Sequence, residues 1–281
     1  MKLDLVDVFG SVAFAGNPLG VVHDAGGLDD AAMLRLTQWL GFSETTFLLP
    51  PTDPAADYRV RIFYPAGELP FAGHPTLGSC HAWLAAGGIS QRDGVVIQQC
   101  GIGLVEVRRD GDRLAFRAPG FTRTGPLDEA ELAEALRVSG ARRDAVVEAV
   151  HVANGPSWRL LRLSSAQDVL DAEPAARAAA GTDIGLAGPH DDDSATDWEL
   201  RAFFADGRGR IIEDPVTGSF NAGVARHLFG SGLAGGSYTA GQGQCIGADG
   251  RVHCRIDADG SVWVGGRVDI IASGASLPAL G

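Results

Sequence analysis

The sequence predicts an α+β protein made of two similar halves, each a mostly antiparallel, curved sheet around one central helix. The first observation is a repeat: the run from Arg61 to Ala85 recurs 140 positions later, from Arg201 to Ala225, with eight identities in 25 gap-free positions. Chance would give about two identities in a chain of this composition. We therefore predict that the two halves descend from one duplicated unit.

A second, shorter repeat lies upstream in each half. The segment that contains Asn17 and Pro18 is similar to Asn154-Gly155-Pro156 in the second half, with Pro18 and Pro156 separated by 138 positions. Two similar halves that face each other would form a cleft, and clefts are where small ligands usually bind. We place the first half at residues 1–118, completed by the C-terminal residues 268–281, and the second half at 119–267.

The predicted central helices are residues 76–86 and 218–229. Both follow the repeated Pro-x-x-Gly-Ser turn, and both are apolar or small around nearly their whole circumference. A helix without a polar face must be surrounded by protein, which predicts one enclosed helix in each half. Helices of the surface type are expected at 29–40, ending at Gly41, and at 128–138 and 173–180.

Short strands bounded by Gly and Asp turns are the third observation. Besides the alternating N-terminal segment 1–9, they are expected at 58–64, 94–97, 104–108, 113–117, 145–152, 158–163, 199–204, 252–256 and 262–265.

Length and composition agree with a globular enzyme. The chain has 281 residues, 45% hydrophobic and 21% charged residues, and a net charge of -12. This charge excludes nucleic acid and anionic membranes as favoured partners, because those surfaces select clustered Lys and Arg. The N-terminus lacks the features of a signal peptide and no run is long enough to span a bilayer, so we expect a cytoplasmic protein. The four cysteines show no metal-ligand spacing, and no metal site is predicted.

Three polar residues lie on or beside the turns that open the central helices: His74, Asp214 and Ser219. Backbone N–H groups at a helix N-terminus bind anions, so Gly73 and Gly218 predict a carboxylate site. Asp214 and Ser219 have an alternative role as helix caps. His74 lies between Gly73 and Pro75, where we expect it not to continue a helix. It is either a ligand-facing acid or base or a structural histidine.

Glu44 is the fourth candidate. In a strand it would share a face with Phe42, Thr46 and Leu48, and desolvation there would raise the pKa of its carboxyl and suit it to carry a proton both ways. The alternative is a solvated glutamate on an edge strand.

Four motifs in order make the chain similar to the PhzF family, named for the phenazine-biosynthesis isomerase. They are Gly16-Asn17-Pro18, Ser43-Glu44-Thr45, the run from Glu68 to Gly78, and the run from Glu213 to Ser219, followed by Gln242-Gly243. The resemblance covers essentially the whole chain. It implies the diaminopimelate-epimerase fold of two α/β rolls, a homodimer, and catalysis without a metal or organic cofactor.

The resemblance also implies roles for residues. Glu44 corresponds to the family's proton-carrying glutamate, and His74, Asp214 and Ser219 to its supporting groups. We expect Glu44, His74 and Asp214 to be catalytic, and Gly73, Gly218, Ser219, Thr217 and Asn17 to bind a small carboxylate substrate. The expected function is isomerization of a small unsaturated carboxylate in secondary metabolism. Alternatives are an epimerase or dehydratase acting on an amino-acid-like substrate, or a binding protein without catalysis.

Two departures from related sequences bear on these alternatives. Related racemases use a thiol immediately before each helix-opening glycine, and Ala72 and Thr217 stand there, so two-thiol racemization is not expected. These two residues are 145 positions apart, which disagrees with the repeat distance of 140. Many relatives also have an arginine shortly after Gln-Gly, where this chain has Ala248.

Overall fold

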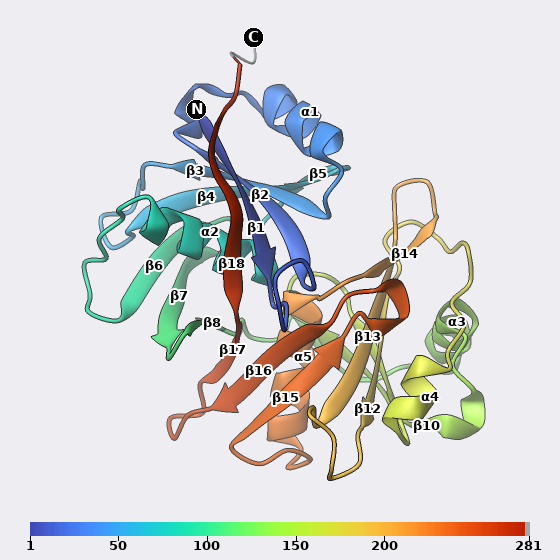
Figure 1. The fold of residues 1–281 in the computed structure, drawn as a ribbon. Coiled ribbons are helices and arrows are strands. Elements are labelled where there is room, and N and C mark those ends of the chain that lie inside the picture. Colours follow the sequence, from blue (N-terminus) through green and yellow to red (C-terminus); the bar gives the residue numbers. More distant parts are fainter. Residues whose placement is uncertain (279–281) are drawn as a thin grey trace. The chain divides into compact units, whose positions relative to one another are not determined.

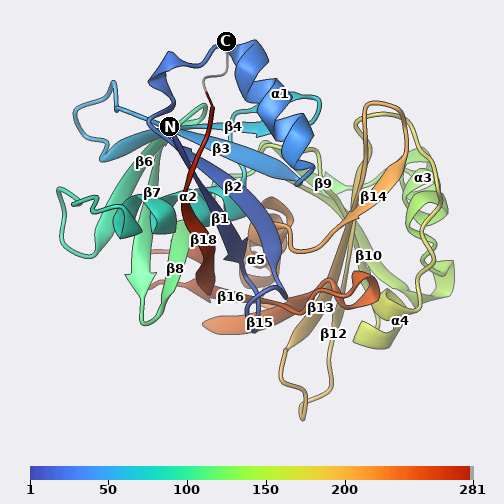
Figure 2. The ribbon, with the colours of Figure 1, turned by 45° about the horizontal axis from the view of Figure 1, so that its top comes forward.

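Strands dominate both units of the computed structural model, which describes residues 1–278 (Figures 1 and 2). One unit is Met1–Arg117 together with the C-terminal segment that starts at Gly265, and the other is Ala118–Val264. Residues 279–281, the end of the segment predicted to complete the first half, lie outside the described residues.

In the first unit, strands follow the order β18-β1-β2-β3-β4-β6-β7-β8, and β5 pairs with β4. The strands are β1 (Lys2–Val8), β2 (Asn17–His23), β3 (Glu44–Leu49), β4 (Tyr58–Tyr64), β5 (Gly67–Leu69), β6 (Val95–Cys100), β7 (Gly103–Asp110), β8 (Arg113–Arg117) and β18 (Val268–Ser276). The helices are α1 (Asp30–Leu40) and α2 (Gly73–Ala85), with a 3₁₀ turn η1 (Ala25–Gly27). The red C-terminal strand β18 lies beside the blue N-terminal strand β1 in Figure 1.

In the second unit, the order is β9-β10-β11-β12-β13-β15-β16, and β14 pairs with β13. The strands are β9 (Arg123–Pro126), β10 (Val146–Ala153), β11 (Arg159–Leu163), β12 (Asp183–Pro189), β13 (Trp198–Ala205), β14 (Ile211–Asp214), β15 (Ser237–Gln242), β16 (Gly250–Ile256) and β17 (Val262–Gly266), the last reaching the unit boundary. The helices are α3 (Glu129–Ser139), α4 (Ala166–Leu170) and α5 (Gly218–Gly230), with 3₁₀ turns η2 (Arg143–Ala145) and η3 (Gln244–Ile246).

The two units share one connectivity. In the first, β2 pairs with β3 and β4 with β6 in parallel; in the second, β11 with β12 and β13 with β15 do the same. The other strand pairings with a described register are antiparallel. The predicted α+β class, with a mostly antiparallel curved sheet around a central helix in each half, is confirmed.

Helices α2 and α5 are the predicted central helices, and both are longer than expected at their N-terminal or C-terminal end. Helix α2 packs against β1, β2, β3 and β8, and α5 against β10 and β16. Glycine allows these close approaches. A Cβ on Gly78 would lie 2.5 Å from Cδ2 of Leu19, and one on Gly223 would lie 2.5 Å from the backbone oxygen of Val152.

Structural equivalence corrects the repeat distance within the helices. Arg61 in β4 and Arg201 in β13 are 140 positions apart and play the same part: each stacks on the phenylalanine two positions on and pairs with a glutamate, Glu68 or Glu213. These glutamates are 145 positions apart, as are Gly73 and Gly218, the first residues of α2 and α5.

The change from 140 to 145 falls in the hairpins. Phe63 pairs with Glu68 across four intervening residues, 64–67, whereas Phe203 pairs with Glu213 across nine, 204–212. The carboxylate of Asp206 closes the longer loop by accepting hydrogen bonds from the backbone N–H groups of Arg208 and Arg210. The Gly-Ser identity of the gap-free alignment is therefore coincidental, because Ser79 lies in the second turn of α2 and Ser219 in the first turn of α5.

The surface helices show where local signals suffice. Helix α1 has Asp29 as its N-cap, which accepts a hydrogen bond from the Ala32 N–H, and Gly41 in the left-handed conformation as its C-cap. Helix α3 has a complete capping box made by Asp128 and Glu131. Both helices match the sequence prediction to within one residue at each end.

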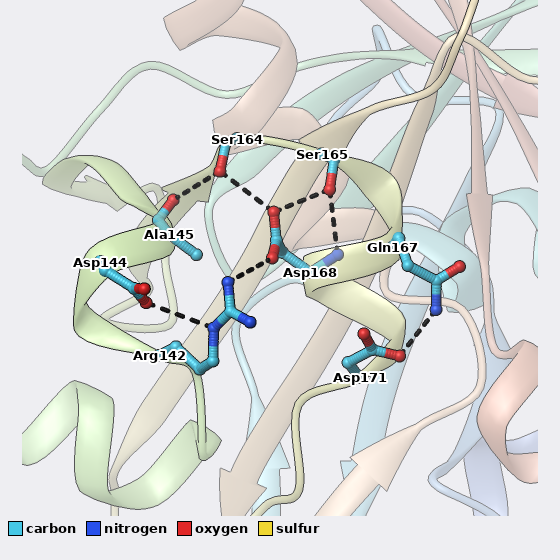
Figure 3. Close-up of polar contacts among 8 residues, drawn as sticks. All are labelled: Arg142, Asp144, Ala145, Ser164, Ser165, Gln167, Asp168 and Asp171. Atoms are coloured by element: carbon cyan, nitrogen blue, oxygen red, sulfur yellow. Dashed lines mark hydrogen bonds and ion pairs between the residues drawn. The ribbon is translucent and has the colours of Figure 1, made fainter.

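The expected helix at 173–180 is wrong. That segment is irregular because its backbone bonds to residues distant in sequence: Ala175 N–H donates to the carbonyl of Val138 in α3, and Ala178 N–H to that of Gly209 in the turn before β14. The nearby helix is α4, with Ser165 as N-cap (Figure 3). There the Asp168 carboxylate accepts hydrogen bonds from the hydroxyls of Ser164 and Ser165 and faces Arg142.

Candidate active site

Glu44 is the first residue of β3, an inner strand. Parallel β2 lies on one side of β3, with Leu19 opposite Glu44, and antiparallel β4 lies on the other. The carboxylate side chain is 16% exposed. The edge-strand alternative for Glu44 is therefore wrong.

The face of β3 that carries Glu44 lies along α2. Oε2 of Glu44 is 3.5 Å from Nε2 of His74, and two strand residues later Thr46 accepts a hydrogen bond of 2.8 Å from the Ser79 hydroxyl. Two strand residues advance about 6.6 Å and five helix residues about 7.5 Å, so strand and helix stay in step over this distance. This match places Glu44 beside the start of α2, with its side chain directed toward His74.

His74 is the second residue of α2, so the expectation that it does not continue a helix is wrong. Pro75 is tolerated here because the first N–H groups of a helix have no acceptor within the helix. The imidazole is 3% exposed, and burial lowers the pKa of His74 to about 3. The Glu44–His74 contact at neutral pH is thus between a carboxyl group and a neutral imidazole.

Asn17 determines which nitrogen of this imidazole carries the proton. It is fully buried at the start of β2, and its side-chain nitrogen lies 3.4 Å from Nδ1 of His74. An amide NH₂ only donates, so Nδ1 accepts and the single proton of the neutral ring is on Nε2, facing Glu44. Glu44, His74, Asn17 and Gly73 therefore form one cluster in the first unit, which we call the Glu44 cluster.

The other predicted residues form a second cluster, in the second unit, around the start of α5. Asp214 ends β14 and is 7% exposed. Its Oδ2 accepts a hydrogen bond of 2.7 Å from the hydroxyl of Thr217, which is the N-cap residue of α5. The N-cap position belongs to Thr217, so the capping alternative is wrong for Ser219, which lies inside α5; for Asp214 it stays a prediction. We call Asp214, Thr217, Gly218 and Ser219 the Asp214 cluster.

Gln242, at the end of β15, holds this turn in place. Its Oε1 accepts hydrogen bonds from the Thr217 N–H and from the Asn221 side chain, at 3.1 and 2.8 Å. Its Nε2 donates to the Asp214 carbonyl and to the Thr217 hydroxyl, at 3.1 and 2.9 Å. The side chain is fully buried with all four hydrogen bonds made. Sequence reasoning noted Gln242 only as part of a motif, and its structural role depends on a contact 25 residues away.

Ser219 is held by two residues of the turn between β10 and β11. Asn154 donates to the Ser219 carbonyl at 2.8 Å, and the indole Nε1 of Trp158 donates to the Ser219 hydroxyl oxygen at 3.0 Å. Sequence reasoning did not assign a role to Asn154 or Trp158. The signal was present, because both lie in the segment that answers Asn17-Pro18 in the second half.

The two helix starts lack side-chain caps. Neither Ala72 nor Thr217, the N-cap residues of α2 and α5, makes a side-chain cap hydrogen bond. The side chains of the N-cap residues therefore do not bond the first-turn N–H groups that begin at Gly73 and Gly218, and the helix dipole favours negative charge there.

The described residues contain no group of three or more His, Cys, Asp or Glu side chains arranged to hold a metal ion. The cysteines are thiols of two kinds. Burial raises the pKa of Cys80 and of Cys254 to about 12, whereas Cys100 is half-buried and Cys245 is exposed. Across residues 1–278, no helix is both long and apolar enough to cross a membrane.

Ala248 lies in the turn that follows Gln242. Its N–H donates to the carbonyl of Gly243, which has a φ of 99°, and its side chain is partly exposed. Alanine therefore fits the backbone of this turn, and nothing in the described contacts requires a longer side chain.

Known proteins resemble this chain over 60% to 99% of its length. A predicted epimerase from Pseudomonas aeruginosa has the same fold, with a TM-score of 0.77 and 28% identity over 99% of both chains. The trans-2,3-dihydro-3-hydroxyanthranilate isomerase of Pseudomonas fluorescens is 33% identical over 234 residues, which cover 80% of this chain and 78% of the relative. The Antisense-enhancing sequence 1 protein of Schizosaccharomyces pombe is 38% identical over 60% of each chain.

The fold, the two clusters and these relatives define an isomerase with a diaminopimelate-epimerase-like fold. The family model described as phenazine biosynthesis-like protein, PhzC-PhzF, matches residues 6–274. The chain belongs to this family.

Proposed function

We propose that this protein catalyses a proton shift within a small, unsaturated metabolite that carries a carboxylate, with Glu44 as the proton carrier and without a cofactor. The observation that carries the proposal is the contact between Glu44 and His74 at the start of α2, 3.5 Å long and almost closed to solvent. Abstraction of a C–H proton needs a positioned base and a donor for the charge that develops on the substrate. Glu44 is the base, and the Nε2–H of His74 is the donor.

The neutral state of His74 suits this chemistry. Because burial lowers the pKa of the ring to about 3, the imidazole donates a hydrogen bond at neutral pH without adding a positive charge beside Glu44. A proton taken from one carbon by Glu44 can then return to another carbon of the same substrate. The substrate itself loses and gains one proton, so no oxidant, reductant or second reactant is required.

The anion-binding part of the proposal rests on the uncapped helix starts. In the first unit, the N–H groups that begin at Gly73 are assigned to a carboxylate. In the second unit, the N–H groups that begin at Gly218, the hydroxyl of Ser219 and the carboxylate of Asp214 are assigned to polar groups of a ligand. Thr217 contributes through the hydrogen bond that orients Asp214. Asn17 is assigned the role of fixing the tautomer of His74.

The structure gives no support to two-thiol racemization. Ala72 and Thr217 are the N-cap residues of α2 and α5, the equivalent positions of the two units, and neither side chain can take a proton from carbon. The one-base isomerase is therefore preferred to a two-thiol racemase, and the chirality of the product would distinguish it from an epimerase that uses Glu44.

Relatives suggest the first compound to try. We propose a role in secondary metabolism, and trans-2,3-dihydro-3-hydroxyanthranilate, the compound named for the Pseudomonas relatives, is the starting substrate for a panel of cyclic, unsaturated amino-carboxylates.

The test follows deuterium from D₂O into the product by NMR. We expect deuterium at the carbon that receives the proton, and Glu44→Gln should lower its uptake about 1,000-fold while ligand affinity changes little. Glu106→Gln, on an exposed side chain that faces Arg92 and Arg117, is the matched control and should behave like the wild type. Wild-type uptake by Glu44→Gln would show that another group moves the proton.

A further inference from the structure

We propose that Trp158 is a positioning residue that fixes the direction in which the Ser219 hydroxyl donates its proton. This inference rests on the proposed function, because it gives Ser219 a defined part in it: a hydrogen-bond donor to the substrate.

The geometry of Trp158 allows one hydrogen-bond direction. The residue lies directly before β11 and is 3% exposed, and its Nε1 is 3.0 Å from the Ser219 oxygen. An indole N–H only donates, so the Ser219 oxygen accepts this bond, and its own proton must point elsewhere. The ring of Phe220, with its centroid 5.2 Å from that of Trp158, packs on the indole and holds its orientation.

Backbone contacts fix the rest of Ser219. Its carbonyl accepts the hydrogen bond from Asn154, and its position in the first turn of α5 is set by Thr217, which Gln242 holds. Among the described residues, the accepted bond from Trp158 is the hydrogen bond of the Ser219 hydroxyl. These contacts hold the Ser219 oxygen in one position, and its proton points away from the indole.

The first unit contains the same device in different residues. His74 and Ser219 are 145 positions apart, and each is the second residue of its central helix. In each case a group that can only donate approaches this residue. The NH₂ group of Asn17, at the start of β2, bonds Nδ1 of His74, and the indole N–H of Trp158, just before β11, bonds the Ser219 oxygen. Each donor bonds an accepting atom of its partner, so that the partner's own proton points elsewhere and can be donated.

This arrangement directs the Ser219 proton toward a substrate acceptor. A serine hydroxyl ordinarily rotates, but the accepted indole bond occupies one of the two lone pairs of the Ser219 oxygen and keeps its proton from pointing at Trp158. A carboxylate, carbonyl or developing enolate oxygen fits as the acceptor of that proton.

A double-mutant cycle tests the proposal. Trp158→Phe keeps a ring against Phe220 and removes the N–H, and we expect kcat/KM to fall about 10-fold in the proton-shift assay. Ser219→Ala should lower kcat/KM by at least as much. Trp158→Phe added to Ser219→Ala should lower kcat/KM less than 2-fold further, because the indole acts only through the hydroxyl. Trp83→Phe, in an indole stacked on Tyr58, is the matched control and should leave kcat/KM unchanged.

A second replacement separates the hydrogen bond from packing. Site-specific exchange of Trp158 for benzothienylalanine, which has sulfur in place of the N–H in a ring of almost the same shape, should reproduce the loss seen in Trp158→Phe. Additive losses in the cycle, or full activity of the benzothienyl protein, would overturn the proposal. The outcome for Glu44 is separate: an active Glu44→Gln protein contradicts the proposed function, whereas additivity with an inactive Glu44→Gln protein contradicts only the role of Trp158.

Discussion

The amide nitrogen of Asn17 lies 3.4 Å from Nδ1 of His74, so a residue of β2 sets the tautomer of a residue of α2. Nε2 of the same ring lies 3.5 Å from the Glu44 carboxylate. A strand, a helix and a second strand thus meet at one imidazole. The direction of its proton depends on the strand that does not carry the proposed base.

Asn17→Asp should reverse that direction. An aspartate at this position accepts from Nδ1–H, so Nε2 would present a lone pair to Glu44 instead of a proton. We expect a loss in kcat of about 100-fold. ¹⁵N NMR of the His74 ring, assigned with His74→Asn, should show the proton on Nε2 in the wild type and on Nδ1 in the variant. An unchanged tautomer together with the full loss of activity would contradict this explanation.

Burial of neutral His74 should make the protein less stable in acid. Its pKa is about 3 in the folded state and about 6.5 in the unfolded state, so between these values the unfolded chain binds more protons and stability falls as pH falls. Above pH 6.5 the ring is neutral in both states, so burial of His74 causes no pH-dependent loss of unfolding free energy there. From pH 7.5 to 4.5, the wild type should lose about 2–3 kcal/mol more unfolding free energy than His74→Asn. Urea unfolding at both pH values measures this difference. Equal losses in the two proteins would show that His74 is charged or exposed when folded.

Gly223→Ala should disrupt the contact between α5 and β10. The new Cβ would lie 2.5 Å from the Val152 carbonyl oxygen, which is backbone and cannot turn away. We expect a loss of about 3 kcal/mol in unfolding free energy. Gly230→Ala, in the same helix with no neighbour within 4 Å, is the control and should gain about 0.5 kcal/mol. Thermal and urea unfolding measure both. A Gly223→Ala protein as stable as the wild type would mean that the helix and strand approach less closely.

Much of the fold follows from local signals in the sequence. Asp29 and Gly41 predict both ends of α1, and the missing polar face of α2 and α5 predicts their enclosure. Residues 173–180 could not be predicted in this way, because alanine favours a helix locally but the backbone there bonds to residues that are distant in sequence.

The candidate residues follow the same rule. The strand periodicity places Glu44 on the face of Thr46, and the structure has both against α2. The partners of Ser219 and Asp214 are not predictable from periodicity, since Trp158 and Gln242 reach them across 61 and 28 positions. The five-residue shift between the halves was visible as an inconsistency, but only the lengths of the two hairpins explain it.

The hydroxyl of Thr217 donates one hydrogen bond to Asp214 and accepts another from Gln242. These two hydrogen bonds restrict which substitutions the position can accept. Two-thiol chemistry would need cysteine at both N-cap positions. At Ala72 a single substitution adds a thiol without breaking a side-chain hydrogen bond. At Thr217 the same change would break two short hydrogen bonds in a buried network, and a weakly bonding sulfur would not replace them. The two halves of the duplication are therefore unequal starting points, and the path to a racemase requires repacking around Gln242 before a second thiol becomes useful.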